Sequence, residues 1–176
     1  MHSLRSLLLP TRAADMDLLR HLAFTLAGCG RRADALRHAA RACELRPHDP
    51  RALSDHGCIH ALCGDLRGAL SRYNAALDVD RDFAVGWHNL GVALARLGDS
   101  RAACRAFRNA LLLDDQCAET WLALGKLLVD VGLPERALPT FERAERLAAH
   151  PGLSFTIPAA PRIPGDRPCD FSPSES

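Results

Sequence analysis

The sequence of 176 residues has few aromatic side chains and almost no net charge. Aromatic residues make up 5% of the chain, its single lysine is Lys126, and the formal net charge is +1. Because β-sandwich cores draw on aromatic and β-branched side chains, a composition with 48% hydrophobic residues and few aromatics favours packed helices. A net charge near zero provides no field that attracts a phosphate backbone, so we do not expect a nucleic-acid partner.

The sequence also lacks long apolar runs. No stretch approaches the roughly 20 apolar residues of a membrane-spanning helix, so we expect no membrane span. The apolar stretch Leu7–Leu9 is too short for a secretory signal and ends at Pro10. We therefore expect a cytoplasmic protein. Arg5 and Arg12, with no acidic residue before Asp15, leave a mitochondrial presequence as the alternative.

Cysteine is present in an odd number and never as a CxxC pair. Disulfide scaffolds are short and rich in loops, whereas most of these cysteines fall within helical stretches. We interpret them as reduced thiols that act as small apolar residues, which favours a reducing compartment. The seven are Cys29, Cys43, Cys58, Cys63, Cys104, Cys117 and Cys169.

A pattern that recurs every 34 residues, in four copies and without insertions, organises most of the chain. Each copy has a large apolar residue at the same position near its start: Leu19, Leu53, Trp87 and Trp121. A small residue follows four positions later: Ala23, Gly57, Gly91 and Gly125. A glycine then recurs in every copy: Gly30, Gly64, Gly98 and Gly132. The second half of each copy carries an alanine and, four positions on, Ala39, Tyr73, Phe107 or Phe141.

This spacing predicts two helices in each copy. Apolar residues three and four positions apart lie on one helical face, and the recurring glycine lies where the first helix must end. Asp65 and Asp99 follow that glycine as candidate N-caps, and Pro134 suits the first turn of a helix. One hairpin buries only part of its apolar surface, so we expect the four hairpins to stack into a continuous core.

The pattern resembles the tetratricopeptide repeat, most plainly where Trp87, Leu90 and Gly91 are followed by Ala103 and Phe107. The resemblance implies an all-α fold, a right-handed α-solenoid of antiparallel helix pairs. We expect residues 1–15 to form a partial N-terminal cap and the proline-rich residues 152–176 to be extended or disordered, or to dock onto the array. The predicted repeats are residues 16–49, 50–83, 84–117 and 118–151.

The resemblance also implies a function, since in this family a partner peptide or helix lies in a concave groove lined by the first helices. We therefore expect a protein–protein interaction module or adaptor. A small secretion or assembly chaperone, or a scaffold that self-associates as a homo-oligomer through poorly capped ends, remains an alternative. A third alternative is a metal- or redox-responsive protein centred on the second repeat. The groove positions carried over by the resemblance are Asp17, Arg20, His21, Arg51, Ser54, Asp55, His88, Asn89, Glu119 and Lys126.

One segment has the spacing of a metal site. His56, His60 and Cys63 lie at i, i+4 and i+7 on one helical face, with ligand types that suit zinc, and Cys29 is a possible fourth ligand. However, both histidines stand in columns where other copies have leucine, which favours partly buried histidines, so we expect no metal and no other cofactor. The sequence has no nucleophile elbow, phosphate-binding glycine loop or paired acids, so we do not expect an enzyme.

Overall fold

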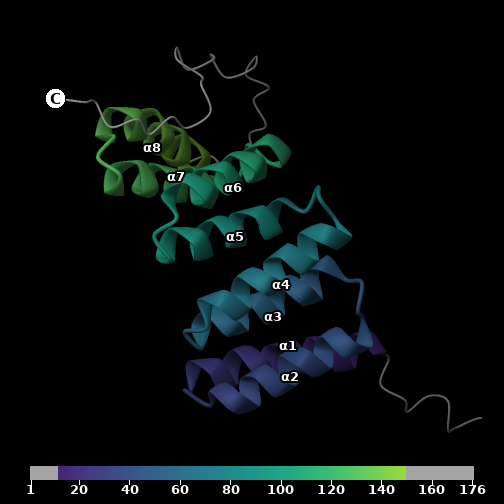
Figure 1. The fold of residues 1–176 in the computed structure, drawn as a ribbon. Coiled ribbons are helices and arrows are strands. Elements are labelled where there is room, and N and C mark those ends of the chain that lie inside the picture. Colours follow the sequence, from purple (N-terminus) through teal and green to yellow (C-terminus); the bar gives the residue numbers. More distant parts are fainter. Residues whose placement is uncertain (1–11, 150–176) are drawn as a thin grey trace, which may run out of the picture.

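A computed structural model describes residues 12–149, which form eight helices and no strand (Figure 1). The expectations for residues 1–11 and 150–176, including the proline-rich tail, lie outside the described residues. The first helix begins at Arg12, so it includes the end of the segment that we expected to form a cap. The helices are α1 (Arg12–Gly28), α2 (Arg32–Leu45), α3 (Pro50–Leu62), α4 (Leu66–Val79), α5 (Ala84–Arg96), α6 (Ser100–Leu113), α7 (Ala118–Asp130) and α8 (Pro134–Ala149).

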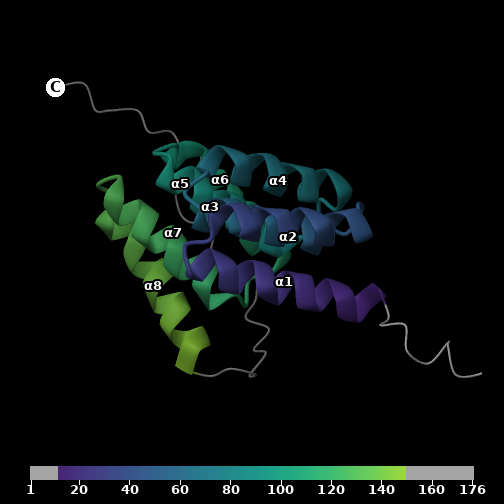
Figure 2. The ribbon, with the colours of Figure 1, turned by 90° about the horizontal axis from the view of Figure 1, so that it is seen from below.

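The helices form four hairpins that stack in chain order, from α1/α2 at one end to α7/α8 at the other (Figure 1). Seen from below, α7 and α8 run across the direction of the first helices, so the stack twists along its length (Figure 2). Each odd-numbered helix also contacts the next odd-numbered helix, which places α1, α3, α5 and α7 along one side. The prediction of an all-α solenoid of helix pairs is confirmed.

The turn inside each hairpin is built as the sequence predicts. Gly30, Gly64, Gly98 and Gly132 have φ angles of 76°, 86°, 86° and 78°, a left-handed conformation that glycine adopts at little cost. The carboxylate of Asp65 then accepts a hydrogen bond from the backbone N–H of Gly68, and Asp99 caps α6 in the same way.

The core of the last three hairpins depends on an aromatic ring that packs against a glycine. A Cβ atom added to Gly57 would lie 2.6 Å from the ring of Tyr73, and one added to Gly91 would lie 2.7 Å from the ring of Phe107. Phe141 stands in the same relation to Gly125. The absence of a side chain at these glycines is therefore what allows the two helices of each hairpin to close on the ring.

Candidate functional site

The polar residues expected in the groove connect neighbouring odd-numbered helices. Nε of Arg20 on α1 lies 2.9 Å from Oδ2 of Asp55 on α3. The Nε–H is not aligned as a hydrogen bond, so the contact is an ion pair. One repeat later, Nδ2 of Asn89 on α5 donates to Oγ of Ser54 on α3 over 3.0 Å. Arg20 and Ser54 stand at one position of the repeat, and Asp55 and Asn89 stand at another. The same contact therefore recurs, first as an ion pair and then as a neutral hydrogen bond.

The third contact between neighbouring odd-numbered helices involves Thr120, which the sequence analysis did not predict as a site residue. Ala123 offers no polar group to His88, and Nδ1 of His88 instead lies 2.9 Å from Oγ1 of Thr120 on α7. The Thr120 hydroxyl donates to the sulfur of Cys117, which leaves its oxygen to accept from His88. Burial lowers the pKa of His88, with Glu119 opposing the shift, so the ring is neutral at pH 7. A threonine where the other copies have leucine, alanine or glycine was the available signal.

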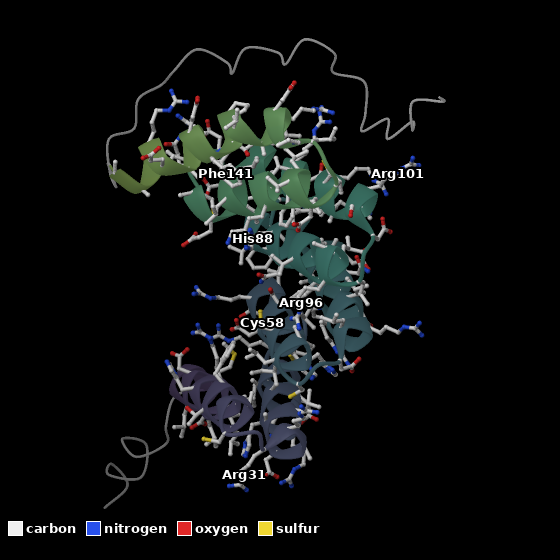
Figure 3. The ribbon with its side chains drawn as sticks, turned by 90° about the vertical axis from the view of Figure 1, so that its left-hand side faces the viewer. Arg31, Cys58, His88, Arg96, Arg101 and Phe141 are labelled. Carbon is white, nitrogen blue, oxygen red and sulfur yellow. The ribbon has the colours of Figure 1, made fainter. Side chains whose placement is uncertain are left out.

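These contacts follow the long axis of the stack. Arg31, Cys58, His88 and Phe141 succeed one another from the first hairpin to the last in Figure 3. The amide of Asn89 also reaches the sulfur of Cys58, at 3.6 Å, so this side chain is engaged within the array.

The predicted groove residues differ in how accessible they are. Ser54 is 2% exposed, contrary to the expectation that it faces the groove, because α5 packs across it and Asn89 binds its hydroxyl. Five others are exposed: Asp17, His21, Arg51, Glu119 and Lys126. The structure brings Asp17 and Arg51 together with Arg20 and Asp55 around one pocket, and it leaves Glu119 and Lys126 on α7, far along the stack.

That pocket, with a volume of about 260 Å³, lies where α1, α2 and α3 meet. Its apolar wall is formed by Ala23, Phe24, Ala39, Ala42 and Ile59, with His56 beside them. Its charged wall combines three arginines and three aspartates: Arg20, Arg46, Arg51, Asp17, Asp49 and Asp55. An apolar cavity with convergent charged groups is the usual form of a binding site.

Comparison with known proteins agrees with this architecture. A family model described as "Tetratricopeptide repeat" matches residues 84–109, within the third copy. Residues 84–109 therefore match a tetratricopeptide repeat, and they lie in the third of the four hairpins. No curated protein matches the sequence.

Solved structures similar to this chain include MamA from Desulfovibrio magneticus RS-1, residues 41 to the end. The TM-score is 0.65 at 20% identity, over 76% of this chain and 76% of that one. Another MamA crystal structure gives a TM-score of 0.65 at 17% identity, over 76% of this chain and 78% of that one. A chain of the Cut9–Hcn1 hetero-tetramer of the APC/C gives 0.65 at 21% identity, over 75% of this chain and 27% of that one. These likenesses establish the fold.

The electrostatics of the pocket are set mainly by burial. Burial raises the pKa of Asp55 above its ordinary value, even though Arg20 and Arg51 act in the opposite direction. Burial also lowers the pKa of His56 to about 4, with smaller contributions from Arg72 and His60. The wall of the pocket therefore presents a neutral imidazole at pH 7.

The candidate metal residues do not converge. His56 and His60 stack with their ring centroids 4.8 Å apart, but Nδ1 of His60 lies 2.9 Å from Oδ2 of Asp65. The sulfur of Cys63 points toward the carbonyl oxygen of Arg32 at 4.0 Å, and Cys29 is exposed. Among residues 12–149 no three histidine, cysteine, aspartate or glutamate side chains form a group that could hold a metal ion. Within the same range, none of the helices combines the length and apolarity needed to cross a membrane.

Proposed function

We propose that this protein is an interaction module that binds a peptide or helix of a partner protein along the side lined by α1, α3, α5 and α7. The observation that carries the proposal is the pocket between the first two repeats, because four predicted groove residues converge on it. They are Asp17, Arg20, Arg51 and Asp55.

The charges on this side fit a protein segment better than a ligand of one sign. The pocket wall has equal numbers of arginines and aspartates, so it presents hydrogen-bond donors and acceptors together. Asp17 and Arg51 are exposed and form no ion pair with another described residue, so their charges are available to a partner. A peptide or helix that carries both polar and apolar side chains matches this surface.

The proposal is tested by charge reversal at the two exposed residues. We would use the full chain as bait in a lysate of the native source and compare it with Asp17→Lys/Arg51→Glu by quantitative mass spectrometry. The matched control is Arg67→Glu/Asp78→Lys, which reverses the same two charges at exposed positions on α4. Each variant's melting temperature is measured first, to establish that it is folded.

We expect proteins that the wild type and the α4 variant both enrich, and that the Asp17/Arg51 variant loses. Equal enrichment by all three baits would contradict the proposal, because binding would then not depend on the groove. Loss from the α4 variant alone would contradict it as well, since it would place the partner on the opposite side of the array.

A further inference from the structure

The outer face of α1 exposes leucines at positions that are buried in the later repeats. Leu18 and Leu22 are 66% and 38% exposed. The residues that stand at the position of Leu22 in the later repeats are all buried: His56, Leu90 and Leu124. Each later first helix packs against the second helix of the preceding hairpin. The outer face of α1 is therefore the surface that a preceding hairpin would cover.

The last hairpin exposes the complementary surface. Phe107 on α6 is buried in a cluster with leucines of α7, but Phe141, at the same position on α8, is only partly buried. Leu122 on α7 and Leu138 on α8 are exposed. Among the described residues no hairpin follows α8. This face is therefore the one that a following hairpin would cover.

The two end faces are the two halves of one kind of interface. Inside the array, Nδ1 of His88 lies 2.9 Å from Oγ1 of Thr120 on the following first helix. One repeat after His88, the same position is Leu122, and the position of Thr120 in the first repeat is Leu18. Leucine thus stands on both sides of the contact where it is left open, whereas the internal contact of this kind is polar. Two leucines match each other as partners, because each removes the other from water.

We propose that the last hairpin of one copy packs on α1 of a second copy, in the register of the internal junctions, so that the chains associate head to tail. A second copy is the occupant because it continues an interface that the array already contains. The contacts of α4 with α5 and of α6 with α7 are that interface within one chain. The inference goes beyond the proposed function and does not depend on it.

The shape of the array decides what kind of assembly results. The first and last hairpins lie at opposite ends of the stack, so one copy can use both faces at once (Figure 1). An interface between two different faces gives a closed ring or an open chain of copies, and it does not stop at a dimer by symmetry. Exposed Lys126 and Glu145, on α7 and α8, give the last hairpin the polar rim of an interface that forms reversibly.

The test measures the mass of three full-length proteins by light scattering over a range of concentrations. They are the wild type, Leu18→Glu/Leu22→Glu, which blocks the face of α1, and Leu122→Glu/Leu138→Glu, which blocks the last hairpin. All four leucines are exposed, and melting temperatures establish that each variant is folded.

We expect the mass of the wild type to rise with concentration beyond twice that of the monomer. Each blocked variant alone should stay monomeric, because its population lacks one of the two faces. An equimolar mixture of the two variants should reach twice the monomer mass and rise no further. In the mixture the intact last hairpin of one variant meets the intact α1 of the other, and the two remaining faces are blocked.

The register is tested by a pair of matched variants that differ only in the sign of one charge. Leu18→Glu/Leu122→Arg places opposite charges at the proposed contact, whereas Leu18→Glu/Leu122→Glu places like charges there. The first should associate at least about tenfold more tightly than the second, and the difference should shrink at high salt. Equal association of the two would overturn the register.

Two results would overturn the head-to-tail inference as a whole. A wild type that stays monomeric at every concentration would show that the end faces do not bind a second copy. Association of either blocked variant by itself would show that like faces meet, as in a two-fold dimer, and not the last hairpin and α1.

Discussion

Arg20 and Asp55 join the first repeat to the second, with 2.9 Å between Nε and Oδ2. Burial raises the pKa of Asp55 despite the nearby guanidinium, so the carboxylate is more costly to ionise here than in water. The equivalent contact between the second and third repeats, from Asn89 to Ser54, carries no charge. The first junction, unlike the second, thus depends on the ionisation of a carboxylate.

The pair of Arg20 and Asp55 predicts how two substitutions change the free energy of unfolding. Arg20→Ala should lower the free energy of unfolding at pH 7 by about 1 kcal/mol, because it leaves a half-buried carboxylate without its partner. The raised pKa means that the contribution of Asp55 to stability is greatest at low pH and declines as the pH rises through the folded-state pKa. Asp55→Asn should remove this decline. Urea denaturation from pH 3 to 7 measures the free energy of unfolding of each variant. If Arg20→Ala lowers that free energy equally in the wild type and in the Asp55→Asn background, the two residues are not energetically coupled and the prediction is contradicted.

His56 predicts a pH dependence of the opposite sense. Its folded-state pKa of about 4 lies below the ordinary value of 6.5, so the unfolded chain takes up the proton first as the pH falls. Stability from this group is therefore complete above pH 6.5 and is lost between pH 6.5 and 4. We expect the wild type to lose about 3 kcal/mol more than His56→Leu over this range. Parallel stability curves for the two proteins would show that His56 does not titrate in this way.

The contact between Gly91 and Phe107 predicts a large cost for one methyl group. Gly91→Ala places Cβ 2.7 Å from the ring and should destabilise the array by about 1–3 kcal/mol. Gly28 is the matched control, because it is also helical but has no atom within 4 Å of its added Cβ. Gly28→Ala should be neutral or slightly stabilising. Similar melting temperatures for the two variants would contradict the assignment of glycine to ring packing.

The last hairpin predicts self-association. Leu122 and Leu138 are 41% and 61% exposed, whereas Cys104, which occupies the place of Leu138 one repeat earlier, is 5% exposed. Among the described residues no helix follows α8 to take the place of the neighbour that covers this face in the earlier hairpins. We expect light scattering to show concentration-dependent association that Leu122→Glu/Leu138→Glu reduces.

The control for association is Leu112→Glu, which removes a leucine that is 84% exposed on α6, away from this end. It should leave association unchanged. A wild-type mass that stays monomeric at all concentrations, or an equal effect of Leu112→Glu, would argue against the end face as the contact.

The cysteine thiols should differ in how fast they react with an alkylating reagent. Burial raises the pKa of Cys43 to about 11 and also raises that of Cys58, and the thiol of Cys43 donates to the carbonyl of Ala52. Cys29 is exposed. In a timed N-ethylmaleimide reaction at pH 7.4 read by mass spectrometry, Cys29 should react at least about tenfold faster than Cys43 and Cys58. Fast labelling of Cys43 would instead support a redox-responsive protein.

The sequence predicted where the helices begin and end, but it did not predict most of the polar contacts between them. The positions of Gly98 and Asp99 follow from local rules, since a left-handed turn and a helix N-cap depend on a few neighbouring residues. Ser54 and Thr120 could not be placed in this way. Their surroundings are decided by how closely the next odd-numbered helix approaches, a distance between residues more than 30 positions apart. The metal-like spacing of His56 and Cys63 likewise describes one helix and omits the neighbours toward which the side chains turn.

The sequence by itself determined the number of repeats, the ends of most helices and the identity of the core columns, because each depends on a short periodic pattern. The tertiary structure alone decided that Arg20 meets Asp55, that Ser54 is buried, and that Ala23 and Ala39 lie in a packed core. The sequence shows that Ala39 is smaller than Phe107, but packing decides whether neighbours collapse into the vacated space. In this protein the neighbours close in, since Ala23 and Ala39 are only 1% and 5% exposed and Phe24 packs against their cluster.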